Sequence, residues 1–317
     1  MQRYEYPTIR EMEENMPVEG FYLMKSASVK TSNGKDRLTG KLADMSGEVD
    51  FVIWDYKDTI HTTAIGAPVK IRGTVSSYNN SLQVTVAMIR EVNAKDAVDL
   101  KRLVPQAPID LPFAFEQVQH MINKEIEDED YRNLCLAMLQ KHANKFAQLP
   151  AGKAVHHAFV GGMLMHTWMM MDHANYLAGL YNQVINKSLL LAATFCHDLN
   201  KDREFEVSPM GIVTDYSTDG FLLGHSYMGA LEVYNVGKEL GMPEEKLTLI
   251  QHCLLSHHGK PEFGAAVVPQ CAEADLLNLI DLTDAHMEIF RETFDKIEPG
   301  TFSDRNFALD RKIYRHE

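Results

Sequence analysis

A histidine and an aspartate stand side by side at positions 197 and 198, where an apolar helical stretch ends. Further histidines and an aspartate occur at long, uneven spacings, each beside an apolar stretch or a glycine turn. The full set is His166, His197, Asp198, His225, His257, His258 and Asp281. Imidazole nitrogens and carboxylate oxygens on successive helix ends can share divalent ions. Any one histidine is more often a surface or core residue, but the ordered set favours a metal site.

The order of these residues resembles that of the HD-domain superfamily of metal-dependent phosphohydrolases. Together with residues 18–27 and 156–162, the chain is similar over nearly its whole length to a subfamily fused to an N-terminal OB-fold, the YhaM-type 3′-to-5′ exoribonucleases. A His-Asp pair alone is common, whereas the ordered set is specific. The family usually reads His-Asp-Ile-Gly-Lys, and here Asn200 precedes Lys201. Because asparagine tolerates left-handed backbone, we expect the turn to be kept.

This resemblance implies roles for individual residues. One ion would be held by His166, His197, Asp198 and Asp281, and Asp198 would bridge to a second ion held by His225 and by His257, His258 or both. Besides Asp198, the implied catalytic residues are Lys201, which would hold a phosphate oxygen, and His157, which would reach the substrate or leaving group. From spacing alone, Asp284 lies on the same helix face as Asp281, three residues earlier, and is expected to orient a ligand histidine. Two divalent ions are expected, manganese first, although iron, cobalt, nickel and zinc suit the same ligands.

Composition fits a soluble protein of two domains. The chain has 317 residues, of which 45% are hydrophobic and 24% charged. No apolar run approaches the roughly 20 residues that cross a bilayer, and no signal segment is evident, so a cytoplasmic location without a membrane partner is expected. The four cysteines are scattered through apolar stretches and are expected to be reduced.

The net charge of −13 is unusual for a nuclease, because proteins that bind phosphates commonly carry a basic surface. Much of the acidic excess lies in short runs, such as residues 125–130, that are typical of solvated helix faces. A site with two divalent cations also supplies positive charge of its own. We therefore expect only modest affinity for nucleic acid outside the active site.

The pattern of the chain changes between residues 93 and 112. Five stretches of strand character precede this region, with hairpin turns expected at Asn33-Gly34 and Asn79-Asn80 and a short helix-permitting segment at 56–64. After three prolines, only helices are expected, at 128–146, 163–180, 188–196, 221–240, 243–255 and 271–294. The prediction is a two-domain α+β protein, with a five-stranded OB-fold β-barrel at 1–95, a linker at 96–112 and an all-α HD-domain helical bundle at 113–317.

OB-folds bind single strands by stacking bases on aromatic rings and pairing phosphates with cations. The candidates are Tyr22, Trp54 and Tyr78 for stacking and Lys25 and Arg37 for phosphates. Each aromatic has about even odds of lying in the barrel core, since side chains alternate between the two faces of a strand. Trp54 and Tyr78 are the better exposed candidates because they stand at strand ends.

Three classes of function remain for such a chain. The first is a metal-dependent 3′-to-5′ exoribonuclease that acts on single-stranded RNA, or also DNA, and releases nucleoside 5′-monophosphates. The second is a phosphohydrolase of small nucleotides with a regulatory OB-fold. The third, an inactive nucleic-acid-binding protein, is disfavoured by the complete ligand set. The native metal, the preference for RNA or DNA, and the choice between monomer and homo-oligomer stay open.

Overall fold

The computed structural model describes residues 6–32, 34–78, 81–93, 95–96, 98–99, 102–153, 157–208 and 210–317. The chain divides into two compact units, residues 1–106 with 207–214 and residues 107–206 with 215–317. Within the described ranges, no helix is both long enough and apolar enough to cross a membrane. All four cysteines are free thiols, and three of them are buried.

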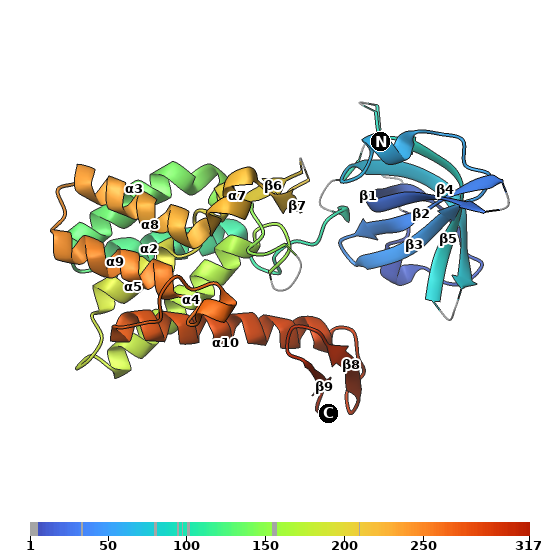
Figure 1. Ribbon diagram of the computed structural model, residues 1–317. Coiled ribbons are helices and arrows are strands. Elements are labelled where there is room, and N and C mark those ends of the chain that lie inside the picture. The colour runs from blue at the N-terminus through green and yellow to red at the C-terminus, as the bar shows by residue number, and fades with distance from the viewer. Residues whose placement is uncertain are drawn as a thin grey trace. The chain divides into compact units, whose positions relative to one another are not determined.

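The first unit is a closed five-stranded barrel (Figure 1). Its strands are β1 (Pro17–Ser32), β2 (Lys35–Asp44), β3 (Gly47–Ile53), β4 (Pro68–Tyr78) and β5 (Ser81–Glu91), with the short helix α1 (Ile60–Thr63) after β3. The spatial order is β1-β2-β3-β5-β4, with β1 paired to both β2 and β4. This strand order is that of the five-stranded Greek-key barrel of the OB-fold. The predicted turn residues Asn33, Asn79 and Asn80 lie outside the described residues.

The length of β1 allows the barrel to close. Its first part pairs with β4 and its second part with β2, with an irregularity in register between Met24 and Ser26. Opposite this point, a Cβ atom on Gly40 would lie 2.0 Å from the carbonyl oxygen of Ser26. Only glycine permits the two strands to approach this closely.

Alternation along the strands decides which aromatic residues reach solvent. Tyr22 and Phe51 are wholly buried in the barrel core, and the hydroxyl of Tyr22 donates to the carbonyl of Pro7 over 2.6 Å. The prediction of Tyr22 as a stacking platform is therefore wrong, because its strand position faces the barrel interior. Trp54 and Tyr78, which follow or end a strand, are 58% and 65% exposed.

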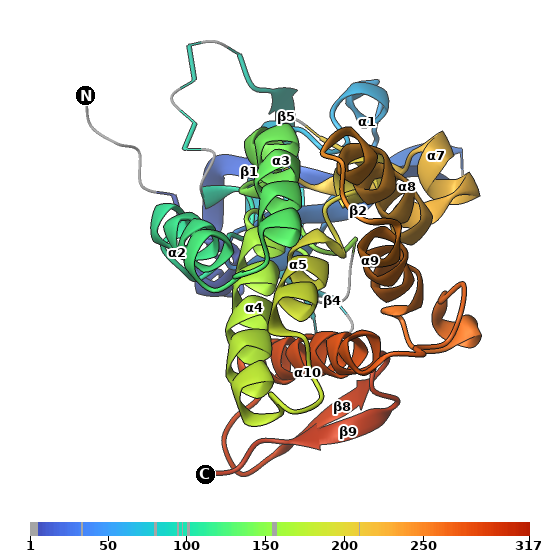
Figure 2. The same ribbon diagram turned by 90° about the vertical axis from the view of Figure 1, so that its left-hand side faces the viewer.

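The second unit is a bundle of helices (Figure 2). They are α2 (Leu111–Lys124), α3 (Glu129–Phe146), α4 (Gly162–Leu180), α5 (Lys187–Cys196), α6 (Lys201–Glu204), α7 (Thr218–Leu222), α8 (Gly224–Glu239), α9 (Glu244–Ser256) and α10 (Ala272–Phe294). α5 packs against α3, α4, α9 and α10, and all its residues from Ser188 to Cys196 are buried. This central helix ends at the His-Asp pair.

The expectation of helices alone after the linker needs a correction. Strands β6 (Phe205–Val207) and β7 (Val213–Tyr216) form one two-stranded sheet, and β8 (Phe302–Asn306) and β9 (Arg311–Tyr314) form another. Strands this short leave too little alternation to stand out against a helical background. The second hairpin follows α10 at the C-terminal end of the chain (Figure 1).

Candidate metal centre

Two of the histidines stand where helices end. His197 is the C-cap of α5 and His257 is the C-cap of α9. The Nδ1 atom of each donates to the carbonyl three residues earlier, Thr194 for His197 and Leu254 for His257, both over 2.7 Å. The last carbonyls of a helix have no partner within it, so this bond satisfies one of them. It also leaves the Nε2 atom of each ring to face the cluster.

A third histidine is fixed by a carboxylate. The Nδ1 atom of His166, in α4, donates to Oδ2 of Asp284 over 2.6 Å, and Nε2 of His157 donates to the same oxygen over 2.8 Å. His157 can come this close to α4 because residue 162 is a glycine. A Cβ atom there would lie only 2.0 Å from the His157 carbonyl oxygen. His157 is wholly buried and shares the carboxylate oxygen of Asp284 with His166, so it helps to position that ring. Its expected contact with the substrate or leaving group stays a prediction.

The fourth histidine is held by a residue that sequence reasoning missed. Glu204, at the end of α6, accepts hydrogen bonds from Nδ1 of His225 over 2.9 Å and from its backbone nitrogen over 3.1 Å. Glu204 and His225 lie 21 positions apart, and no motif links them. Their contact depends on how α6 and α8 pack, so no signal in the sequence could have found it.

The two oxygens of Asp198 face two different groups of donors. Oδ2 lies 3.3 Å from Nε2 of His197 and 3.7 Å from Nε2 of His166, which in turn lies 3.4 Å from Oδ1 of Asp281. Oδ1 of Asp198 lies 3.4 Å from Nε2 of His225. Ligand atoms about 2.1 Å from one ion are roughly 3.0–3.5 Å apart in tetrahedral or octahedral geometry. Both groups therefore have the spacing of a coordination sphere.

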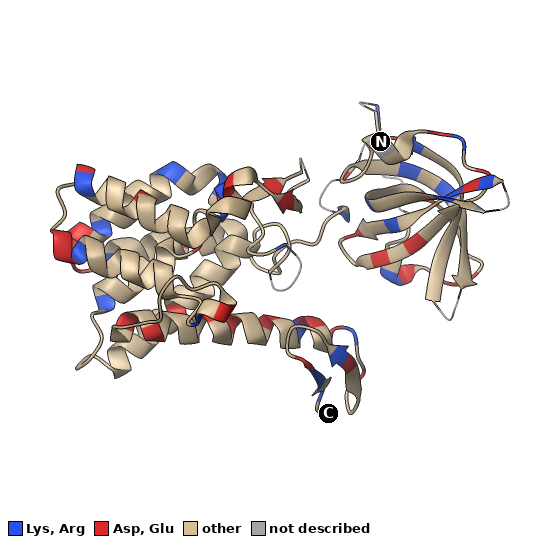
Figure 3. Cartoon of the chain, in the orientation of Figure 1, with Lys and Arg blue, Asp and Glu red and all other residues tan. Residues whose placement is uncertain are grey.

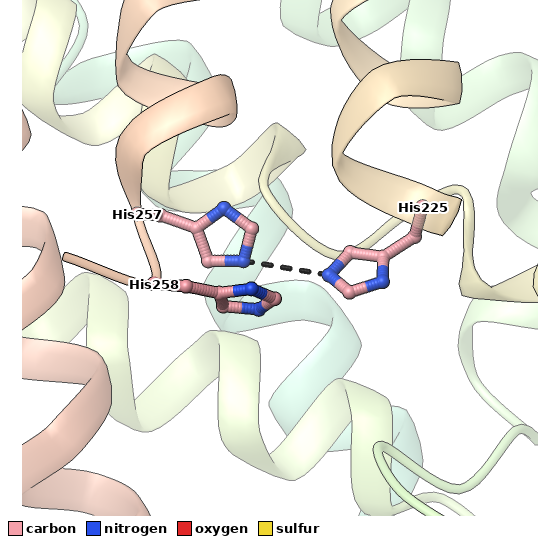
Figure 4. A group of neighbouring side chains, drawn as sticks. All are labelled: His225, His257 and His258. Carbon is pink, nitrogen blue, oxygen red and sulfur yellow. Dashed lines mark hydrogen bonds between the residues drawn. The ribbon is translucent and has the colours of Figure 1, made fainter. Parts of the chain in front are cut away.

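The second group contains a contact that requires a cation. Nε2 of His225 faces Nε2 of His257 at 3.4 Å, beside His258 (Figure 4). The Nδ1 atom of each ring already carries a proton for its own acceptor. In the neutral tautomers that these bonds select, two lone pairs would face each other, so a proton or a metal ion must lie between them. In the first group, the buried Nε2 atom of His197 has no hydrogen-bond partner among the residues that the structure describes, which a metal would remedy. The residues thus fit divalent ions.

Local charge also favours metal binding. Burial lowers the pKa of His257, and the neighbouring His258 adds to this effect. Burial and the charge of His225 lower the pKa of His258 to about 4. Both rings are neutral at pH 7, which is the form that coordinates a metal. Burial alone would lower the pKa of His166, but its hydrogen bonds to Asp281 and Asp284 raise it to about 10. The two carboxylates therefore make this side of the cluster attractive to cations.

Lys201 lies against the shared aspartate. Its Nζ atom donates to Oδ2 of Asp198 over 2.7 Å and to the carbonyl of Ala151 over 2.8 Å. Burial disfavours the charged form of Asp198, but the electrostatic effect of the neighbouring His197 and Lys201 holds its pKa well below the usual range. Two of the three ammonium hydrogens are used in these bonds, which leaves one to reach a phosphate oxygen.

The residue before Lys201 differs from our expectation in its backbone conformation. The turn at Asn200 is kept as expected, but with φ −77° and ψ 4° it does not use left-handed backbone. Its buried amide donates to Oε2 of Glu232 over 2.7 Å, and the same carboxylate oxygen lies 3.2 Å from Nε2 of His142. The other ring nitrogen of His142 lies 3.1 Å from Asp202. Asn200 thus joins the turn of the His-Asp pair to a buried network of charges.

A groove of about 530 Å³ on the barrel brings together three of the predicted strand-binding residues. Arg37, Trp54 and Tyr78 line it with Lys30 and Lys41, and the Arg37 guanidinium lies 5.6 Å from the centre of the Trp54 ring. Lys25 is not among the described residues that line the groove. It is half exposed and forms an ion pair with Glu48.

Comparisons with known proteins agree with this geometry. Residues 163–286 match the family model for the HD domain, and this segment contains His166, Asp281 and every ligand candidate between them. The chain thus combines an OB-type barrel with a helical HD domain. The HD domain and its His/Asp clusters indicate a metal-dependent phosphohydrolase.

Several solved structures show weak similarity. The p204 HINb domain is 13% identical over 28% of this chain, with a TM-score of 0.23, and the chain spans 47% of its length. The second OB-fold domain of replication protein A from Methanococcus maripaludis is 14% identical over 29% of this chain and 98% of its own, with a TM-score of 0.22. An OB domain from Thermoplasma acidophilum is 18% identical over 29% of this chain and 92% of its own, also with a TM-score of 0.22. These scores are too low to assign a fold, which rests on the strand order of the barrel.

The hydrogen bonds of Glu204 lead to a prediction about metal content. Glu204→Ala should release His225 and lower metal affinity on that side roughly 10- to 100-fold, so that bound metal falls from about two ions per chain to about one. Glu204→Gln keeps an oxygen that can accept the hydrogen bond of His225, so it should lose less bound metal. Elemental analysis after gel filtration measures this, with Glu239→Ala, exposed on the helix that carries His225, as the control. Two ions retained by Glu204→Ala would contradict the role of Glu204.

A second prediction concerns stability and pH. Burial alone would lower the pKa of His142, but hydrogen bonds to Asp202 and Glu232 raise it to about 9. This pKa exceeds the ordinary value of about 6.5 for histidine. The charged ring therefore contributes its full stabilisation of the fold below pH 6.5, and this stabilisation is lost as the pH rises to 9. The contribution is roughly 3 kcal/mol.

Chemical unfolding of the metal-free chain from pH 6 to 9.5 tests this. The quantity measured is the difference in free energy of unfolding between the parent and His142→Gln. The difference should shrink as pH rises, while His120→Gln, exposed on α2, should follow the parent. A difference that does not change with pH would show that His142 is not a charged partner of the two carboxylates.

Proposed function

We propose that the chain is a divalent-metal-dependent 3′-to-5′ exonuclease of single-stranded RNA, with DNA as a second substrate, that releases nucleoside 5′-monophosphates. The observation that carries the proposal is the position of Asp198, whose two oxygens face two donor groups of coordination spacing. Manganese is the first candidate for both ions. The direction of cleavage and the preference for RNA follow from the resemblance to YhaM-type enzymes.

The residues divide the chemistry between them. His166, His197, Asp198 and Asp281 would hold one ion, and Asp198, His225, His257 and His258 the other. When bound, two such ions activate a water molecule and neutralise charge on the phosphate. Asp284 and Glu204 fix the rings of His166 and His225 with Nε2 toward the centre. Lys201 keeps Asp198 ionised and offers its remaining hydrogen to a phosphate oxygen.

The barrel groove supports a polymeric substrate. Trp54 and Tyr78 present exposed rings at the ends of two strands, and Arg37 lies close enough to Trp54 to pair with a phosphate beside a stacked base. Stacking is tolerant of sequence because every base has a π-face. An enzyme that degrades a strand step by step needs this tolerance.

A second candidate is hydrolysis of small nucleotides, with the barrel in a regulatory role. It is favoured by the fact that every ligand candidate belongs to the second unit, so the centre needs no residue of the barrel. The two candidates differ in what is turned over.

The proposed function predicts a specific product pattern. With manganese, a 5′-labelled single strand should shorten one nucleotide at a time, and a 3′-labelled strand should release labelled mononucleotide at once. Asp198→Ala should bind less metal and lose at least roughly 100-fold in rate, because both donor groups lose their shared ligand. Internal cleavage, or turnover of mononucleotides and cyclic dinucleotides alone, would contradict the proposal, the latter in favour of the second candidate.

The groove leads to a further prediction. Trp54→Ala in the full chain should weaken binding of single strands about tenfold, in line with the roughly 1–3 kcal/mol contributed by one stacked base. Hydrolysis of bis(p-nitrophenyl) phosphate should not change, because Trp54 belongs to the other unit. Met45→Ala, also in the barrel and exposed but not lining the groove, is the control. Equal loss on both substrates would point to a folding defect.

A further inference from the structure

The hairpin of β8 and β9 carries exposed aromatic side chains that neither the metal centre nor the groove uses. Lys and Arg residues also lie along it (Figure 3). Phe307, in its turn, is 98% exposed, and Phe302 and Tyr314 are 64% and 47% exposed. Soluble proteins seldom leave several aromatic rings in water on one small element, and such patches mark binding sites. This hairpin therefore has the character of an interaction surface.

The aromatic and basic side chains share one face of the hairpin. Phe302 pairs across the strands with Tyr314, their ring centroids 4.9 Å apart, and Arg305 pairs with Lys312. Ile313, between Lys312 and Tyr314, is buried on the opposite face. Because side chains alternate along a strand, Lys312 and Tyr314 point to the same side. The outer face thus combines rings and cations.

The hairpin is fixed to the end of α10. Nη1 of Arg315 donates to the carbonyls of Phe294 and Ile297 over 2.6 and 2.7 Å. The backbone nitrogen of Gly300 donates to the carbonyl of Arg315 over 2.8 Å. These bonds close the base of the hairpin, so its outer face is held ready and little ordering is needed when a partner binds.

The charge of the hairpin identifies the kind of partner. Residues 302–315 contain four Lys and Arg side chains and two Asp side chains, whereas the whole chain has a net charge of −13. Within the described part of the chain, Arg311 and Lys312 form no ion pair, and the pair of Arg305 with Asp310 is exposed and weak. A polyanion complements this face. In a symmetric contact between two copies, the same cations would oppose each other.

We propose that the β8–β9 hairpin is a second contact site for the single strand. Bases would stack on Phe302, Phe307 and Tyr314, and phosphates would pair with Lys312 and its cross-strand partner Arg305. The proposal rests on the proposed function, because it takes the substrate strand as the ligand. Along α10, Asp281 and Phe294 lie about 20 Å apart at the rise of an α-helix. The hairpin would therefore contact nucleotides several positions upstream of the scissile phosphate.

The test compares Phe307→Ala combined with Lys312→Glu against a matched control, Tyr176→Ala combined with Lys124→Glu, which alters an exposed ring and an exposed cation elsewhere in the same unit. Binding of a fluorescent oligouridylate of about 20 nucleotides, longer than one OB-fold site, is measured by anisotropy in the Asp198→Asn background to prevent hydrolysis. The hairpin variant should bind about tenfold more weakly, and the control should match the parent.

Rates on strands of different length complete the test. In the active chain, the hairpin variant should lose about tenfold in kcat/KM on the long strand through KM, and nothing on a dinucleotide that cannot reach the hairpin. Equal binding by variant and parent, or equal loss on both lengths, would overturn the inference. So would a change in oligomeric mass of the hairpin variant by light scattering, which would assign the face to a second copy of the chain.

These outcomes separate the two proposals. Should the parent bind the strand without degrading it, the exonuclease proposal fails, and the hairpin inference stands if the hairpin variant binds more weakly. Should the parent degrade the strand while the hairpin variant binds as the parent does, only the hairpin inference fails. A parent that neither binds nor degrades the strand overturns both.

Discussion

The division of one carboxylate between two groups of ligands constrains the helical unit. Oδ2 of Asp198 meets nitrogens from α4 and from the end of α5, and Oδ1 meets a nitrogen from α8. These contacts of 3.3–3.7 Å hold only if the helix ends stay where the apolar packing around α5 places them. Because protein interiors are close-packed, a change of volume beside α5 would move the ligands. The core and the metal centre therefore depend on each other.

Each imidazole of the cluster has its orientation fixed by ordinary backbone or carboxylate chemistry. Two of the rings satisfy carbonyls that a helix end leaves without partners, and two donate to buried carboxylates, Asp284 and Glu204. In all four cases Nδ1 holds a proton for its own acceptor, so Nε2 is the atom that faces the centre. The orientation of each ring is thus set before any ion arrives, which lowers the cost of organising the site.

The sequence predicts those features that depend on local pattern. Apolar spacing located six helices of the bundle to within a few residues, but α2 was missed because Pro112 was taken as part of a linker, although proline is well tolerated in the first turn of a helix. Because side chains alternate between the two faces of a strand, about half of the barrel aromatics were expected to face inward, but the sequence does not say which ones. Tyr22 proved to be one of those that face inward. Glu204 could not be found at all, because its contact with His225 exists only in the packed bundle.

An acidic chain that binds an acidic polymer must confine its affinity to small areas. Arg37 beside Trp54 in the groove, and Lys312 beside Tyr314 on the hairpin, each place a cation next to an exposed ring. Stacking depends little on salt, whereas each phosphate contact adds to the salt dependence of binding. With few cations and several rings, recognition of the strand would rest mainly on stacking. An acidic surface elsewhere would disfavour duplexes and folded RNA, whose bases are not available to stack, so under the proposed function the net charge of −13 would favour single strands.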